Sequence, residues 1–172
     1  MKIQTKWNLG LMYKSLSDPK IMKDVAEIER AYDAFVKKYE KNKSYLKNSK
    51  ELLKALADYE KLDGLPNPMV YLHLLGDIES DNTKAEALKN KVPQVLAQAS
   101  NKIIFFNLSL GGIPLAQQKV LLNDKSLTKF HYFLKCIFMS SKYRLTEPEE
   151  KILNLKSLPS YNLWVEGQEK LL

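Results

Sequence analysis

The stretch DPKIMKDVAEIERAYDAFVKKYEK, residues 18–41, decides the fold class of this chain. Asp18 followed by Pro19 is typical of a helix start, with an N-cap residue and a proline at the first helical position. Apolar residues then recur at alternating spacings of four and three: Ile21, Val25, Ile28, Tyr32, Phe35 and Tyr39. Such spacing marks one face of an amphipathic helix, so we expect a long helix over about residues 19–41.

The next segment predicts two more helices. The polar residues 42–44 interrupt the apolar pattern, and a second helix is expected from residues 48–49 to the stop at Asp63-Gly64. The residues that we expect it to bury are Leu52, Leu56 and Tyr59. The turn Leu65-Pro66-Asn67-Pro68 then leads into a third helix, expected from Met69 to about Ile78.

The longest predicted helix is the fourth. It begins at Thr83, which can form a capping box with Glu86. Its apolar side is expected to contain Ala85, Leu88, Val92, Val95, Ala99, Ile103 and Phe106. Pro93 removes one backbone hydrogen bond, so we expect a kink there. An alternative for residues 103–110 is a short strand, although the helical period continues through them.

Four further helices complete the prediction. Gly111-Gly112 ends the fourth helix and Ile113-Pro114 opens a fifth, which continues to about Leu122. Either Asp124 or Ser126 caps a sixth, whose inward residues are expected to be Leu127, Phe130, Leu134, Ile137 and Phe138. Thr146-Glu147-Pro148-Glu149 opens a seventh through Leu155, and Ser160 can cap the last. The expected fold class is all-α, an antiparallel array of about seven to eight helices without a significant sheet.

Composition and charge exclude several classes of protein. The chain has 172 residues and no apolar run near the length of a membrane span, and its start lacks the apolar core of a secretory signal. The net charge is +7, and residues 1–50 hold 12 Lys or Arg against 6 Asp or Glu. The excess lies mainly in Lys37, Lys38, Lys41, Lys43, Lys47 and Lys50. Because no aromatic or arginine-rich face accompanies these lysines, a solvated helix end is the better interpretation than nucleic-acid binding.

The sequence contains few residues of the types that catalytic centres use. His73 and His131 are the two histidines, and neither has a second histidine four residues away, so no HExxH motif occurs. Each is interpreted as a helix-packing histidine bonded to a backbone carbonyl or a tyrosine. Cys136 is the single cysteine, which excludes an internal disulfide and favours a cytoplasmic location. Its apolar neighbours suggest a buried, inert thiol. We therefore assign no catalytic, cofactor-binding or metal-binding residue.

A set of short segments, in order along the chain, resembles the amino-terminal helical domain of oligoendopeptidase F-type zinc metallopeptidases. These segments are Trp7-Asn8-Leu9, residues 11–15, residues 18–21, Asp24-Val25, residues 28–32, residues 35–39, residues 105–108, residues 129–134, residues 145–153 and residues 160–164. Asn8 replaces the usual aspartate. The resemblance covers residues 1–172, and it implies a substrate-channel wall that limits a metallo-endopeptidase to short peptides.

The resemblance also implies that the catalytic centre lies outside these 172 residues. In that family the HExxH helix and the zinc ligands come from a later catalytic domain, so zinc and catalysis are expected there. The 172 residues contain no such domain, and the chain alone should be inactive. The implied partners are this catalytic domain and short peptides, with no membrane and no nucleic acid. The alternatives are a stand-alone helical interaction module and, from residues 37–50, a nucleic-acid-binding domain.

The end of the chain predicts an exposed apolar surface. Its apolar residues are Ile152, Leu153, Leu155, Leu158, Leu163, Trp164, Val165, Leu171 and Leu172. One helical stripe buries only part of such a set against the preceding helices. We expect the remainder to pack against the catalytic domain or, in its absence, to cause either self-association through this end or fraying of the last helix.

Overall fold

The computed structural model describes residues 7–78 and 83–171, without the side chains of residues 83–86, 89, 90, 162, 166 and 169–171. Every regular element in these ranges is helical, which confirms the all-α prediction. The α-helices are α1 (Pro19–Tyr39), α2 (Ser49–Asp63), α3 (Pro68–Ile78), α4 (Thr83–Asn101), α5 (Ile104–Gly111), α6 (Leu115–Asn123), α7 (His131–Ser140), α8 (Glu147–Ser157) and α9 (Leu163–Leu171). Across these ranges, no helix combines the length and the apolar character that crossing a bilayer requires.

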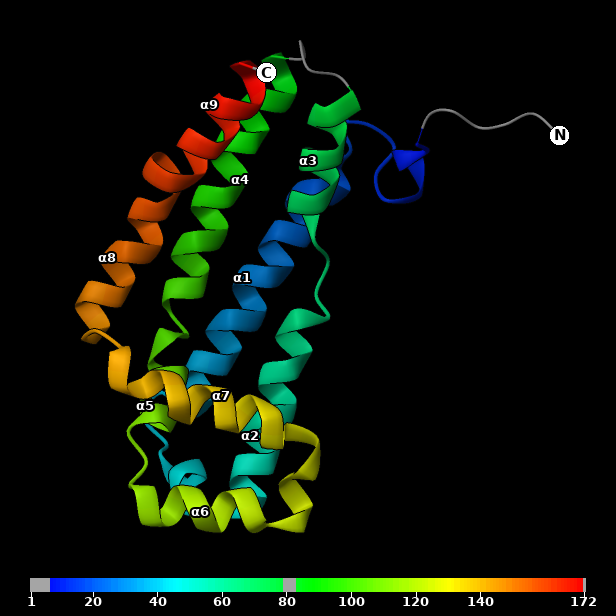
Figure 1. Ribbon diagram of the computed structural model, residues 1–172. Coiled ribbons are helices and arrows are strands. Elements are labelled where there is room, and N and C mark those ends of the chain that lie inside the picture. The colour runs from blue at the N-terminus through cyan, green and yellow to red at the C-terminus, as the bar shows by residue number, and fades with distance from the viewer. Residues whose placement is uncertain (1–6, 79–82, 172) are drawn as a thin grey trace, which may run out of the picture.

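The helices form an elongated array (Figure 1). Helices α1, α3, α4 and α8 run roughly along its length, and α6 and α7 cross one end. Helix α8 lies beside α4 and continues through a short π-helical segment, Leu158–Asn162, into α9. Helix α8 therefore covers one side of α4.

Two hydrophobic clusters share α1. The first half of α1 buries Ile21 and Val25 in a cluster with Tyr13, Tyr71, Leu72, Leu75 and Val92. The second half buries Phe35 and Tyr39 in a larger, aromatic cluster. In this cluster the rings of Phe35 and Phe106 meet edge to face with centroids 5.1 Å apart, and Tyr59 stacks on Phe106 at 5.0 Å. Since such contacts add to the free energy of burial, the aromatic cluster fixes how α1, α2 and α5 pack.

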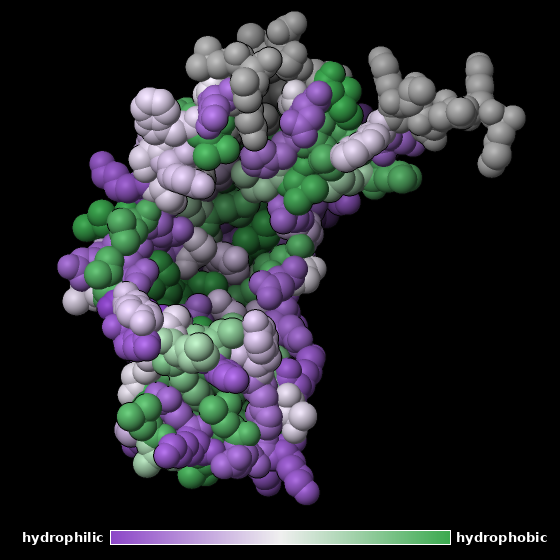
Figure 2. All heavy atoms as spheres, in the orientation of Figure 1, coloured by the Kyte–Doolittle hydropathy of each residue, from purple (hydrophilic) through white to green (hydrophobic). Residues whose placement is uncertain are grey.

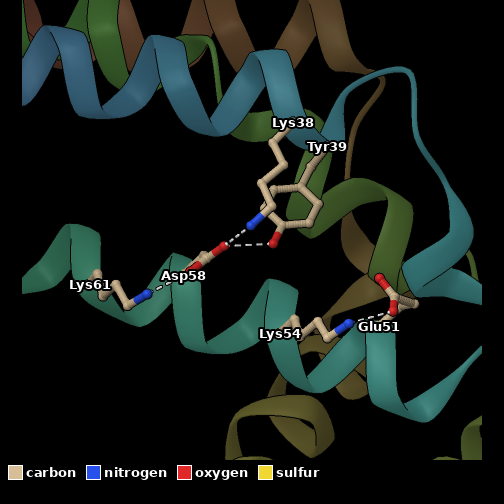
Figure 3. A network of polar contacts seen from close by, with 6 residues as sticks. All are labelled: Lys38, Tyr39, Glu51, Lys54, Asp58 and Lys61. Atoms are coloured by element: carbon tan, nitrogen blue, oxygen red, sulfur yellow. Dashed lines mark hydrogen bonds and ion pairs between the residues drawn. The ribbon is translucent and has the colours of Figure 1, made fainter.

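A polar network joins the end of α1 to α2 (Figure 3). The ammonium of Lys38 and the hydroxyl of Tyr39 both donate to the same oxygen of Asp58, at 2.5 and 2.7 Å. Lys61 donates to its other oxygen at 2.7 Å. These donors, Lys38 first, hold the pKa of Asp58 well below its usual range. Lys38, whose side chain stays exposed, is therefore ion-paired within the fold.

The predicted helix starts are largely confirmed. Asp18 accepts a hydrogen bond from the backbone N–H of Lys20, and Asn48 accepts one from that of Lys50. Asp124, rather than Ser126, is the capping residue of the turn before α7, because its carboxylate accepts from the backbone N–H of Ser126. The capping box predicted for Thr83 and Glu86, and the burial of Ala85, concern side chains outside the described set.

The predicted fourth helix is divided in two, which corrects one expectation. Helix α4 continues through Pro93 but ends at Asn101, and α5 begins at Ile104. The chain tightens between them, because the N–H groups of Lys102 and Ile103 bond to carbonyls three residues back instead of four. Helix α1, with 21 residues, is therefore longer than α4, with 19. The strand alternative for residues 103–110 is wrong, since these residues are helical from Ile104 onward.

The predicted cap at Ser160 is also wrong. Ser160 lies within the π-helical segment, and its hydroxyl donates to the carbonyl of Lys156 at 2.5 Å. The hydroxyl of Ser157 donates to the carbonyl of Asn154 in the same way, at 2.8 Å. Pro159 lacks an N–H group and so removes one α-helical hydrogen bond here, and the two hydroxyls bond to carbonyls around the irregular turn. The chain thus passes from α8 to α9 without a loop.

Candidate interface on the last two helices

The two histidines do not form a metal centre. His73 is exposed on α3, so its interpretation as a packing residue is wrong. His131 lies at the start of α7, and its Nε2 is 3.1 Å from the carbonyl oxygen of Asp124, as predicted. A catalytic zinc needs three protein ligands. Within the part of the chain that the structure describes, no group of three His, Cys, Asp or Glu side chains lies close enough to hold one.

Cys136 is exposed, which corrects the prediction of a buried thiol. The buried residues of α7 are Leu134, Ile137 and Phe138. Because successive helical residues are about 100° apart, Cys136 lies two positions from Leu134 on the opposite side of the helix. Apolar neighbours in the sequence therefore did not indicate burial.

Helix α8 is packed with its polar side inward. None of its residues is buried. The half-buried positions are Glu147, Glu150, Lys151, Asn154 and Ser157. These recur at spacings of three and four, so they form one helical face, and all of them are polar. An amphipathic helix normally buries its apolar face. Helix α8 does the reverse.

Asn154 is the main attachment of this polar face. Its amide nitrogen lies within hydrogen-bonding distance of three acceptors on α4: the carbonyl of Ala97 and the hydroxyl of Ser100, both at 3.1 Å, and the side-chain oxygen of Asn101 at 2.6 Å. Asn101 in turn donates to the carbonyl of Lys151 at 3.4 Å. A side-chain network therefore joins α8 to α4 at the centre of their contact.

The apolar side of the last two helices faces outward. Ile152 is 57% exposed and Trp164 is 81% exposed. The other large apolar residues that are exposed there are Leu153, Leu155, Tyr161, Leu163 and Val165. Figure 2 shows hydrophobic residues along the outer edge of the molecule over α8. The expected exposed apolar surface is therefore present, although Leu158 is half-buried and the side chains of Leu171 and Leu172 lie outside the described set.

A pocket of about 400 Å³ opens beside α9. Its lining includes Pro159, Leu163, Trp164, Gly167 and Gln168, and it is mainly apolar. At Gly167 no side chain is present, and a Cβ atom placed there would meet nothing within 4 Å. The pocket is thus an open depression that an apolar side chain of another molecule could fill.

The same side of the molecule has a second concave region. Figure 2 shows a hollow between α3 and the helices on the α4–α8 side, and hydrophobic residues lie on its floor. Helix α7 closes its lower end in Figure 1. The hollow and the exposed apolar residues over α8 are thus visible in the same view of the molecule.

Sequence reasoning missed the roles of Asn101 and Asn154. The two residues are 53 positions apart, so no local pattern connects them. The one available signal was the row Glu147, Lys151 and Asn154, whose spacings of four and three define a polar helical face.

A family model matches the last third of the chain. The amino-terminal peptidase M3 family model, described as Oligopeptidase F, matches residues 110–170. No curated protein and no solved structure matches the chain. The matched range begins near the end of α5 and includes most of α9. It also includes α8, the helix whose polar face points inward. It supports an amino-terminal domain of an oligoendopeptidase F-type peptidase. The resembling segments from Trp7 to Leu108 lie outside this range.

Proposed function

We propose that this chain is a non-catalytic helical domain that packs beside the zinc-containing catalytic domain of an oligoendopeptidase F-type peptidase. In this proposal it forms part of the wall of the substrate channel and limits access to short peptides. The observation that carries the proposal is the exposed apolar surface of α9 around its pocket, which lies within the range matched by the family model.

The surface has the chemistry of a protein interface. Trp164 and Leu163 are exposed next to an open apolar pocket, and exposed aromatic residues beside pockets are typical anchor positions in interfaces. Covering a few hundred Å² of such surface is worth several kcal/mol, at about 25 cal/mol per Å². We propose that the catalytic domain covers the α9 pocket and that the hollow of Figure 2 faces the channel.

The test combines this chain with a purified HExxH-containing catalytic domain of the same peptidase type that lacks its own amino-terminal helices. Quenched fluorescent peptides of increasing length report the cleavage rate with and without this chain. We expect a complex that cleaves short peptides and loses activity as the peptides lengthen. A Trp164→Ser variant should bind more weakly, whereas Tyr132→Ser, at an exposed site on α7, should bind normally.

Two outcomes contradict the proposal. One is the absence of a complex at any ratio of the two proteins. The other is a complex with an unchanged length preference, which would favour the alternative of a helical interaction module without a role in the channel.

A further inference from the structure

The outward face of α8 carries a regular apolar row. Pro148, Ile152 and Leu155 follow one another at spacings of four and three, and all of them are exposed. This is the spacing of the apolar seam between two packed helices. The seam is on the side of α8 opposite to Asn154, so it is free while α8 stays bound to α4.

Two opposite charges border this seam. Glu149 and Lys156 are both exposed and are seven residues apart, so they lie on the same edge of the helix, two turns from each other. The backbone N–H and the hydroxyl of Thr146 both donate to Glu149 and hold its pKa below the usual value. Glu149 is therefore negatively charged at neutral pH, and Lys156 is positively charged.

The arrangement is self-complementary. A two-fold axis perpendicular to α8 between Ile152 and Leu153 places a second copy of the helix antiparallel to the first. Because Glu149 and Lys156 are equally far from this axis, Glu149 of each copy then faces Lys156 of the other. The same operation brings the two apolar rows together. Both Glu149–Lys156 pairs lie on the same edge of the seam, and their attraction favours this antiparallel register.

We propose that the outward face of α8 is a homodimer interface, in which two copies of this chain pair their α8 helices antiparallel around Ile152. The charge pattern identifies a second copy as the occupant. The inference does not rest on the proposed function, since the α9 pocket assigned to the catalytic domain is lined by Pro159, Leu163, Trp164, Gly167 and Gln168, and none of these belongs to the α8 seam. A single helix pair forms an interface at the small end of the stable range, so we expect a dissociation constant in the micromolar range.

Sedimentation equilibrium of the whole chain tests the proposal. The wild-type chain should show a reversible monomer–dimer equilibrium. Ile152→Asp places a charge at the centre of the seam and should weaken the dimer more than tenfold. Met139→Asp is the matched control, because Met139 is 62% exposed on α7 and outside the seam, and it should leave the equilibrium unchanged. Far-ultraviolet circular dichroism checks that each variant remains helical.

A charge exchange tests the register. Lys156→Glu replaces both attractive pairs of the dimer with repulsive ones and should weaken self-association severalfold. Glu149→Lys should do the same. An equimolar mixture of these two variants restores both attractive pairs, so it should form a mixed dimer with an affinity near that of the wild type. Glu149→Lys also removes the carboxylate that accepts the capping hydrogen bond from Thr146. Glu149→Gln keeps an oxygen that can accept this bond, so it should weaken the dimer less.

Three results overturn the inference. The first is a wild-type chain that remains monomeric at all accessible concentrations. The second is a dimer that Ile152→Asp leaves intact, which would locate the interface elsewhere. The third is a mixture of the two charge variants that associates no better than either variant alone.

Discussion

The side-chain amide of Asn154 on α8 donates a 2.6 Å hydrogen bond to the side-chain oxygen of Asn101 on α4. Both residues are half-buried, and the pair lies where another protein would place two apolar side chains. Among the described residues that follow Phe138, none belongs to either hydrophobic cluster. The position of α8 and α9 therefore depends on a few hydrogen bonds, whereas the rest of the array depends on buried apolar area.

We expect Asn154→Ala to loosen α8 and α9 without unfolding the remaining helices. The variant leaves the side-chain oxygen of Asn101 without its donor, at a local cost of about 1–3 kcal/mol. Amide hydrogen exchange should become faster over residues 147–171 and stay unchanged in α1 and α2. Lys135→Ala, at an exposed position of α7, is the control. Equal acceleration throughout the chain would show that α8 is part of the main cooperative unit.

Removing the aromatic side chain of Phe106 should destabilise the whole array. Phe106 is fully buried and contacts the rings of Phe35 and Tyr59. We expect Phe106→Ala to lower the free energy of unfolding by about 3–5 kcal/mol, as measured by urea denaturation. Ile152→Ala should change it by less than about 0.5 kcal/mol, provided that the measurement is made on the monomer. Similar effects of the two changes would contradict the assignment of the core.

The lowered pKa of Asp58 predicts that the fold loses stability in acid. Its pKa is lowered in the folded chain, so its stabilising contribution is complete above the unfolded-state value of about 3.9 and is lost as the pH falls below it. Asp58→Asn should lower the free energy of unfolding at pH 7 by about 1–2 kcal/mol. The difference between variant and wild type should shrink as the pH falls toward 3, which urea denaturation at several pH values can measure. A difference that does not depend on pH would contradict this role.

The purified chain should neither bind stoichiometric zinc nor cleave peptides. His73 and His131 lie on different helices, and the described residues offer no three-ligand group. Metal analysis after dialysis and a quenched fluorescent peptide assay measure the two properties. Hydrolysis that a chelator abolishes, from a preparation without other peptidases, would show that the ligand count is misleading.

Much of the fold could be predicted because most helices bury their apolar face. The row from Ile21 to Tyr39 is buried except for Tyr32, which is half-buried, and the five inward residues predicted around α7 are all buried. In these helices local spacing and tertiary packing agree, so the spacing alone located the core.

The candidate interface could be predicted only in part. An apolar surplus near Trp164 was visible in the sequence, but the inversion of α8 was not, because it depends on hydrogen bonds to α4 between distant residues. The break after Asn101 was missed for a related reason. The backbone N–H groups of Lys102 and Ile103 bond to carbonyls three residues back instead of four. This tightening leaves the spacing of the apolar residues almost unchanged, so the apolar pattern continues although the helix ends.

The π-helical segment between α8 and α9 has a consequence for the evolution and engineering of this surface. A π-turn corresponds to an α-helix with one inserted residue. That insertion changes the phase of everything after it by about 100°. Removing one residue between Leu158 and Asn162 would restore an unbroken α-helix and turn Trp164 to a different azimuth. A single-codon deletion could therefore redirect the anchor residue of α9 while leaving the seam of α8 where it is.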